Sequence, residues 1–356
     1  MLNFDLNSWL KDAAARCGFD LCGIAPAEIE PRNRNQYLRW LDQGFHGEME
    51  YMKRFERQNL RALLPSVRSV ICVGMNYNTD HPLSIDCDDP TRGWIARYAW
   101  GDDYHELMRH RMQSLVEELE GIAGPGLETK IYVDTGPLLE RALAWAAGLG
   151  WIAKNTCLIN EGLGSWFLLG EVLTNLDLDP GLPPPDRCGS CTSCLEACPT
   201  GAITEPYVLD ATRCISYYTI EVKGAIPQPL RSQMGRHVFG CDICQDVCPW
   251  NRAAPRTANP GFQPRPLPTD ANEPAQSAFN PPLELLAGLD EEQFNQMSRG
   301  SPIRRPKYRG FLRNVAVAMG NSGDGKFRPI LERLTKHSDP LIREHAAWAL
   351  DQLKVE

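Results

Sequence analysis

Two runs of cysteine constrain the fold of this 356-residue chain more than any other feature. The first is Cys188-Gly-Ser-Cys191-Thr-Ser-Cys194-Leu-Glu-Ala-Cys198-Pro199, in which two, two and three residues separate successive cysteines. The second is Cys241-Asp-Ile-Cys244-Gln-Asp-Val-Cys248-Pro249, which lacks a first cysteine because Val238 occupies that position. Cys214 is the only other cysteine between the runs, so the stretch offers eight thiols.

The spacing is typical of bacterial ferredoxins that bind two 4Fe-4S clusters, in which the fourth cysteine of each run ligates the other cluster. Tetrahedra of four thiolates also suit structural zinc, but this spacing, with proline after each terminal cysteine, favours iron and sulphide. Two neighbouring clusters indicate that electrons are moved one at a time. The rule predicts two ligand sets: Cys188, Cys191, Cys194 and Cys248 on one cluster, and Cys198, Cys214, Cys241 and Cys244 on the other.

Composition predicts a globular cytoplasmic protein with two or three domains, since 43% of its residues are hydrophobic. No apolar run approaches the roughly 18 residues that span a bilayer, and the stretch Met1-Leu-Asn-Phe-Asp-Leu lacks the order of an export signal. The net charge of −8 argues against a protein that coats nucleic acid with its whole surface. The other cysteines are expected to be packing residues: Cys17, Cys22, Cys72, Cys87 and Cys157.

Residues 1–177 are predicted to form an α/β domain, with strands over 19–25, 67–74 and 130–133 and helices over 6–17, 32–64, 103–120 and 138–149. Asp134 follows a strand and precedes a helix, which is where α/β proteins place catalytic residues. An Asp in that position also commonly caps a helix, and both roles stay open. To act as an acid, Asp134 would need burial among Ile131, Val133 and Leu138 to raise its pKa above about 3.9.

Basic residues gather in two places. Arg54, Arg57 and Arg61 form either a solvated face or an anion clamp. The stretch from Gln293 to Gly323 contains no Asp or Glu. It is either solvated surface or a binding site for phosphate backbone. Its basic residues include Arg304, Arg305, Lys307, Arg309 and Arg313.

The remaining segments are predicted to be a ferredoxin-like domain over 178–252, a proline-rich linker over 253–282 and an all-α domain over 283–356. Eight prolines in residues 254–282 favour an extended strap. The segments Arg313-Asn-Val-Ala316 and Arg343-Glu-His-Ala346 align at an offset of 30 residues. They indicate a short stack of HEAT-like helical repeats.

Several further motifs carry a resemblance to a known family. They are Arg97-Tyr-Ala-Trp-Gly-Asp-Asp-Tyr-His105, Tyr132-Val-Asp134-Thr-Gly-Pro137-Leu-Leu-Glu-Arg141, Gly150-Trp-Ile-Ala-Lys154-Asn155-Thr156 and Cys214-Ile-Ser216-Tyr-Tyr-Thr-Ile-Glu221. With the cysteine runs, they make nearly the whole chain resemble the epoxyqueuosine reductases, cobalamin-dependent iron-sulphur enzymes that complete queuosine synthesis in tRNA. A plain ferredoxin has only the cysteine runs.

The resemblance implies that the N-terminal domain holds cobalamin with its cobalt facing the clusters, and that Asp134 is the proton donor. Asp103-Tyr-His105-Glu-Leu-Met108 begins the motif of enzymes that ligate cobalt through histidine, but Met108 replaces its glycine. This absence fits a cobalt without a protein ligand, and equally a protein without a corrinoid. The implied cofactor contacts are Arg57, Arg97, Asp134, Asn155, Ser216, Cys241 and Asp242.

The resemblance also implies a tRNA anticodon arm carrying epoxyqueuosine as substrate, an external electron donor such as a flavodoxin or ferredoxin, no membrane partner and a monomer. A corrinoid reductive dehalogenase is one alternative, but it usually carries an export signal and has no use for the basic stretch. A non-catalytic electron carrier is another, but it does not need the Asp134 site. The implied tRNA contacts are Glu221, Val222, Lys223, Arg304, Arg305, Lys307, Arg309 and Arg313.

Overall fold

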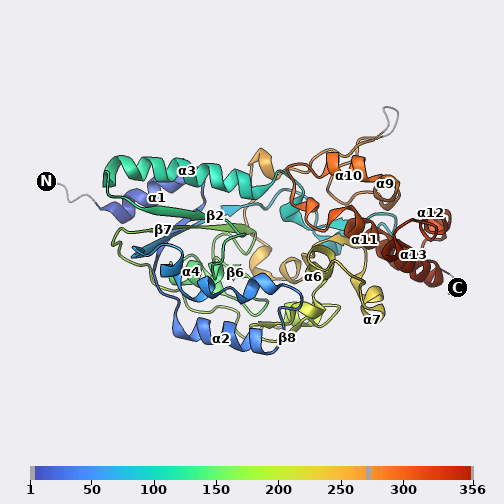
Figure 1. Ribbon diagram of the computed structural model, residues 1–356, viewed down its shortest axis with the longest axis horizontal. Coiled ribbons are helices and arrows are strands. Elements are labelled where there is room, and N and C mark those ends of the chain that lie inside the picture. The colour runs from blue at the N-terminus through green and yellow to red at the C-terminus, as the bar shows by residue number, and fades with distance from the viewer. Residues whose placement is uncertain (1–4, 270–273, 354–356) are drawn as a thin grey trace.

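The computed structural model describes residues 5–269 and 274–353. The molecule is elongated, with the N-terminal sheet at one end and the C-terminal helices at the other (Figure 1). Parts of three predicted segments lie outside the described residues: 1–4 at the start of the N-terminal domain, 270–273 in the linker and 354–356 at the C-terminus. Among the helices that the structure describes, none has both the length and the apolar character needed to cross a membrane.

The N-terminal sheet has four strands in the order β1 (Leu21–Pro26), β2 (Ser69–Asn76), β7 (Phe167–Thr174) and β4 (Thr129–Tyr132). Each neighbouring pair is antiparallel. The α/β prediction for this domain is therefore wrong, and the domain is α+β, because its strands do not form the parallel sheet of α/β proteins.

Helices cover both faces of this sheet (Figure 1). The side chains of β2 alternate between the two faces, as strand geometry requires. Ile71 and Val73 pack in one core with α1 (Leu6–Arg16) and α3 (Tyr104–Ala123), whereas Val70 and Cys72 pack in another with α4 (Glu140–Ala146). Because both faces are covered, every residue of β2 is buried.

The helix predicted over residues 32–64 is shorter than expected. Helix α2 runs over Pro31–Asp42, and Gly44 and Gly47 follow it with φ of +71° and +56°. This left-handed backbone favours glycine and stops the helix. The rest of the segment forms three 3-10 turns: η1 (Glu50–Lys53), η2 (Phe55–Gln58) and η3 (Leu60–Ala62).

The cysteine-rich region consists of short elements. They include the helices α5 (Ser193–Ala197), α6 (Ile215–Ile220), α7 (Gln228–Arg231) and α8 (Ile243–Asp246) and the hairpin of β8 (Ile203–Glu205) and β9 (Val208–Leu209). A second small hairpin, β5 (Trp151–Ile152) with β6 (Leu158–Ile159), borders this region: Trp151 and Ile159 pack with Cys248.

The predicted domains share their cores. Strand β3 (Trp94–Ile95) leaves the N-terminal part and pairs in parallel with β10 (His237–Phe239) of the cysteine-rich region. Trp94 and Trp100 then join a core built mainly from the C-terminal helices. Phe262, in the predicted linker, is only 1% exposed and belongs to a core of the N-terminal part. The described part of the linker is thus packed on the protein rather than extended between separate domains.

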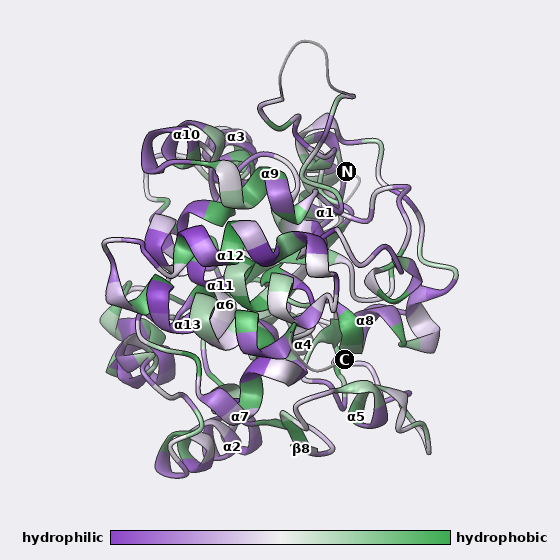
Figure 2. Cartoon of the chain, turned by 90° about the vertical axis from the view of Figure 1, so that its right-hand side faces the viewer, coloured by the Kyte–Doolittle hydropathy of each residue, from purple (hydrophilic) through white to green (hydrophobic). Residues whose placement is uncertain are grey.

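The C-terminal helices are α9 (Leu283–Gly288), α10 (Glu291–Met297), α11 (Lys307–Asn321), α12 (Arg328–Leu334) and α13 (Pro340–Gln352). Figure 2 looks onto this end of the chain, where α11, α12, α13 and α6 are grouped. Helix α11 is buried from Gly310 to Gly320, and a Cβ on Gly320 would lie 2.8 Å from the Cα of Ala349 in α13. The two segments aligned at an offset of 30 residues thus lie on packed helices, and their identity as HEAT-like repeats stays a prediction.

Candidate functional site

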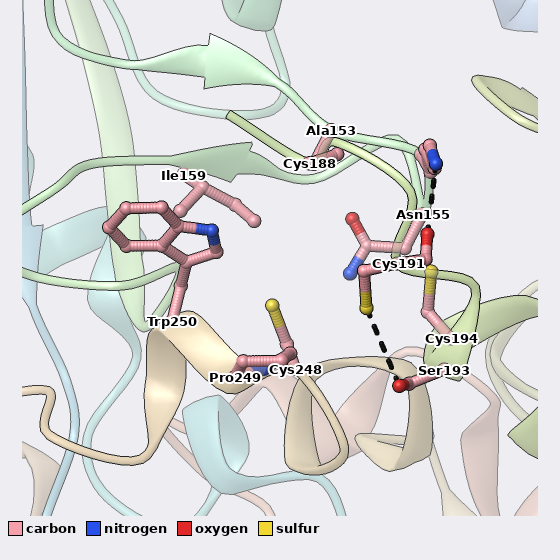
Figure 3. Close-up of a pocket in the computed structure, with 11 residues that line it drawn as sticks. Ala153, Asn155, Ile159, Cys188, Cys191, Ser193, Cys194, Cys248, Pro249 and Trp250 are labelled. Carbon is pink, nitrogen blue, oxygen red and sulfur yellow. Dashed lines mark hydrogen bonds between the residues drawn. The ribbon is translucent and has the colours of Figure 1, made fainter. Parts of the chain in front are cut away.

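The first predicted ligand set lines one cavity. Cys188, Cys191, Cys194 and Cys248 line it together with Trp250, and Figure 3 shows their side chains around it. Burial and then the neighbouring Cys248, Cys188 and Cys191 raise the pKa of Cys194 to about 11, which reflects how closely the four thiols gather. Lys154 holds the cysteine loop by donating to the carbonyls of Gly189 (2.6 Å) and Cys191 (2.9 Å).

The second predicted set is also gathered. Burial and the neighbouring Cys214 raise the pKa of Cys241 well above its usual range, with a smaller contribution from Cys198. For Cys244 the largest cause of its raised pKa is a hydrogen bond with Cys157, followed by burial and by Cys241 and Cys214. Cys157, interpreted from the sequence as a packing residue, therefore also contacts this set.

The described residues contain no group of three His, Cys, Asp or Glu side chains that converge on a single metal ion. A cubane does not require such convergence, because each of its four cysteines binds a different iron atom.

Asp134 lies in a loop of residues 133–139 between β4 and α4, which we call the Asp134 loop. Tyr104 Oη donates a 2.8 Å hydrogen bond to Asp134 Oδ2, and His105 Nε2 lies 3.2 Å from the same oxygen. The Asp134 side chain is 57% exposed, so a ligand can reach it. Helix α4 is capped by no side chain and its N-cap is Leu139, which removes the capping role that the sequence left open for Asp134.

His105 links two carboxylates. Its Nδ1 lies 2.6 Å from Asp103 Oδ1 and its Nε2 faces Asp134. Burial opposes protonation of His105, but the hydrogen bonds to Asp103 and Asp134 outweigh it and raise its pKa to about 9. His105 is therefore an imidazolium cation at neutral pH.

Asp134 does not meet the condition of a raised pKa that a carboxylic acid donor would need. Burial does act in that direction, but the hydrogen bonds from His105 and Tyr104, with the charges of His105 and Arg305, lower the pKa of Asp134 below its usual value. At neutral pH the proton of this pair resides on His105, and Asp134 is ionised. His105 occurs in a sequence motif that did not indicate this role.

The residues proposed as cofactor contacts divide into two groups. Arg97 is 1% exposed, donates to the carbonyl of Thr79 (2.8 Å), and its backbone N–H donates to Asp242 Oδ2 (2.8 Å). These two side chains are therefore engaged within the protein. The others lie near the cysteines or the Asp134 loop: Asn155 donates to Cys244 O (3.1 Å), Ser216 hydrogen-bonds to Cys214, Cys241 belongs to the second set, and Arg57 donates to Leu138 O (2.6 Å).

Most of the predicted tRNA contacts share one surface. We call the exposed cations Lys223, Arg304, Arg305, Lys307 and Arg309 the basic patch. Arg305 forms a bidentate pair with Glu221 at 3.2 and 2.9 Å. Its guanidinium lies 5.9 Å from the ring centroid of Tyr51, and its charge contributes to lowering the pKa of Asp134. The basic patch therefore borders the Asp134 site.

Two predicted tRNA contacts are wrong. Arg313 is fully buried and donates to the carbonyls of Tyr218 (2.6 Å) and Val222 (2.9 Å), so it joins α11 to α6 and cannot reach a ligand. The Val222 side chain is buried as well.

Comparisons with known proteins identify relatives of the whole chain. The family model "Epoxyqueuosine reductase QueG, DUF1730" matches residues 57–135, and the model "4Fe-4S double cluster binding domain" matches residues 187–251. The chain is 42% identical over 354 residues to epoxyqueuosine reductase of Xanthomonas campestris pv. campestris. The aligned region covers 98% of this chain and 96% of that protein.

Solved structures similar to this chain are also epoxyqueuosine reductases. One is epoxyqueuosine reductase with a tRNA-Tyr epoxyqueuosine-modified stem loop, with a TM-score of 0.86, 31% identity and coverage of 98% of this chain and 90% of that one. Another, with the same TM-score, identity and coverage, is the Bacillus subtilis enzyme with a catalytic loop swung out of the active site.

Proposed function

The chain belongs to the epoxyqueuosine reductase family, and from this premise we propose that it reduces epoxyqueuosine to queuosine at the wobble position of tRNA anticodons, the last step of queuosine synthesis. The observation that carries the proposal is that the basic patch meets the Asp134 site through Arg305. An RNA-binding surface that borders a proton-transfer site fits an enzyme acting on a nucleotide within a polynucleotide. A dehalogenase or a simple electron carrier needs no such surface.

Epoxide reduction to an alkene and water consumes two electrons and two protons. The match to a double 4Fe-4S cluster model over residues 187–251 replaces the zinc interpretation. We assign one cluster to Cys188, Cys191, Cys194 and Cys248 and the other to Cys198, Cys214, Cys241 and Cys244, because each set is gathered in space. An external donor of single electrons, such as a flavodoxin or ferredoxin, would load the clusters of a monomeric enzyme.

The donor set of the chain is compatible with a cobalamin whose cobalt has no histidine ligand. Both ring nitrogens of His105 are engaged by carboxylates, so His105 is unsuited to that role. Asn155, Ser216 and Cys241 are the proposed residues near the cofactor. When bound, a strongly reduced cobalt supplies a nucleophile or electron donor toward carbon.

The residues of this chain supply one proton to the leaving oxygen, and the second comes from solvent. As a C–O bond of the epoxide breaks, charge develops on oxygen, and a positioned acid lowers the barrier. Asp134 lies at the accessible end of the pair and His105 stores the proton behind it. Asp134 thus acts as the proton donor by taking a proton from His105 as the oxygen becomes basic. Because a catalytic loop is swung out in the Bacillus subtilis relative, we propose that the Asp134 loop also moves during turnover.

The pH dependence of turnover tests this arrangement. His105 has a raised pKa of about 9, so the donor form is present below that pH and is lost above it. Turnover should therefore fall as pH rises through about 9. In His105→Gln turnover should be lower and this alkaline decline should be absent. The measurement is the rate of queuosine formation in single turnovers with prereduced enzyme. A decline near pH 9 that persists in His105→Gln would contradict the role of His105.

The activity itself is tested by anaerobic reconstitution of the chain with iron, sulphide and cobalamin, followed by incubation with a strong reductant and tRNA that contains epoxyqueuosine. Nucleoside analysis should show queuosine replacing epoxyqueuosine. Omitting cobalamin should abolish the conversion. If the fully loaded protein leaves epoxyqueuosine unchanged, the proposed reaction is wrong.

The basic patch should account for the salt-dependent part of tRNA binding. Among the described residues, Arg304 and Lys307 make no ion pair and are exposed, so they are free to contact phosphate. The double variant Arg304→Ala/Lys307→Ala should bind the anticodon arm more weakly, and the slope of log affinity against log salt should decrease by about one per lost contact. Lys11→Ala, an exposed lysine on α1 at the other end of the molecule, should change neither quantity. If the parent and both variants show the same slope of log affinity against log salt, the basic patch does not contact the phosphates of tRNA.

A further inference from the structure

Two aromatic side chains in the segment between α2 and β2 are exposed to solvent and have no role in the mechanism above. Five large hydrophobic side chains of the described residues are exposed, and the aromatic ones among them are Tyr51 (40% exposed) and Phe55 (64% exposed). They lie four residues apart, in the 3-10 turns η1 and η2. Leaving an apolar ring in water costs free energy, so two such rings in one short segment indicate a surface that binds a partner.

Tyr51 lies between the Asp134 loop and the basic patch. Toward the loop, the guanidinium of Arg57 lies 5.9 Å from the Tyr51 ring centroid, and the same guanidinium donates to the carbonyl of Leu138 (2.6 Å). Toward the basic patch, the guanidinium of Arg305 also lies 5.9 Å from that centroid. An RNA that contacts the basic patch and places one nucleotide at the Asp134 site therefore has Tyr51 beside it.

Phe55 extends this surface toward a cavity. The neighbouring Arg54 lines a cavity of about 350 Å³ together with Arg109, Lys130 and residues of the Asp134 loop. The ion pair that Arg54 forms lies at the surface, where water screens it and leaves the guanidinium able to approach an anion. Positive charge beside the Phe55 ring suits a ligand that carries a phosphate next to each base.

The chemistry of these side chains matches an unpaired nucleobase. Every base has a π face, and single-stranded bases are recognised by stacking on aromatic rings and on guanidinium planes. The hydroxyl of Tyr51 has no hydrogen-bond partner among the described residues, so the ring is the part of this side chain that its neighbours contact. A ring flanked by cations binds the base through its face and the adjacent phosphates through charge.

We infer that Tyr51 and Phe55 form a stacking site for the unpaired bases next to the modified nucleotide of the anticodon loop. The inference rests on the proposed function for RNA as the substrate, and it adds how the loop is held. The modified base must leave the stack of the loop to reach Asp134, and its neighbour then loses a stacking partner. Tyr51 replaces that partner, and Phe55 extends the site by one base.

Binding of a synthetic anticodon arm, with guanosine at the wobble position, tests this inference without turnover. The protein is the full-length chain loaded with its clusters and cobalamin. Tyr51→Ala and Phe55→Ala should each lower the affinity by about 5–150-fold, the range expected for one lost stacked base. Tyr51→Phe keeps the ring and should restore the affinity. Because stacking releases no counterions, the slope of log affinity against log salt should stay equal to that of the parent.

A second measurement identifies which part of the RNA the Tyr51 ring contacts. An anticodon arm with an abasic nucleotide next to the wobble position lacks the base that Tyr51 would stack. The parent should bind this arm as weakly as Tyr51→Ala binds the intact arm, whereas Tyr51→Ala should bind both arms equally. This pattern is that of two groups in direct contact, since removal of either one removes the whole interaction.

Ile122→Ala is the matched control, because it removes an exposed apolar side chain near the end of α3 that is distant from Tyr104. It should bind the arm as the parent does, and every variant should keep the iron content and corrinoid absorbance of the parent. Three results would overturn the inference: parent-like binding by Tyr51→Ala or Phe55→Ala, a salt slope reduced as in Arg304→Ala/Lys307→Ala, or weaker binding that follows loss of corrinoid. Each leaves queuosine formation by the parent, the test of the proposed function, unaffected.

Discussion

Replacing Asp134 with Asn is expected to reduce queuosine formation by about 10²–10⁴-fold, the range typical of losing a positioned general acid. The amide has nearly the same shape and still accepts hydrogen bonds from Tyr104 and His105. It cannot take the proton that His105 stores and pass it to oxygen. The effect should appear in single turnovers with prereduced enzyme, so that delivery of electrons does not limit the rate.

The matched variant is Tyr104→Phe, which removes a hydrogen bond to the same Oδ2 atom but leaves the carboxylate in place. It should lose less activity than Asp134→Asn, because a hydrogen bond to a charged group contributes about 1.5–3 kcal/mol and the carboxylate that transfers the proton remains. Both variants should retain the iron content and corrinoid absorbance of the parent. Parent-like turnover in Asp134→Asn would remove Asp134 from proton transfer.

Replacing Cys214 with Ala is expected to halve the iron content, from about eight to about four atoms per chain. Cys214 is the one ligand that lies outside both cysteine runs, and its assignment to the second set rests on its proximity to Cys198, Cys241 and Cys244. The variant should keep the cluster bound by the other set. Iron and sulphide analysis, with electron paramagnetic resonance of the reduced protein, measures the loss.

Cys157→Ala is the control for that experiment. Cys157 hydrogen-bonds to Cys244 but is not among the eight assigned ligands, so the variant should keep about eight irons. If Cys157→Ala loses a cluster and Cys214→Ala does not, the ligand assignment of the second set must be exchanged between these two residues.

The structure gathers both predicted cysteine sets, in part because the spacing within each run is a local property of the chain, and the assignment of each ligand to a cluster stays a prediction. The sequence also placed Asp134 correctly at the end of a strand, since β4 ends at Tyr132. It did not predict the antiparallel order of the sheet, because β7 pairs with both β2 and β4 from far along the chain. Pairing between distant strands depends on tertiary packing that no local pattern reports.

The misassigned residues have a different physical cause. The absence of acidic residues shows that the stretch is positively charged, but it does not show which side chains point to solvent. It therefore did not distinguish the exposed Arg304 from Arg313, which is buried in α11 and donates to backbone carbonyls. The lowered pKa of Asp134 depends on its contact with His105, which is 29 residues away in sequence. This contact forms only because α3 packs beside the Asp134 loop in the folded protein.

Strand β3 pairs in parallel with β10, and Trp94 and Trp100 pack among the C-terminal helices. The regions of the chain therefore cannot be expressed as separate fragments without loss of structure. Cutting the chain between its regions would strip two indole rings of their surroundings and leave an unpaired strand edge on each fragment. The electron-carrying segment is accordingly not a detachable module. Its orientation toward the Asp134 site is fixed by the same interior that supports the basic patch.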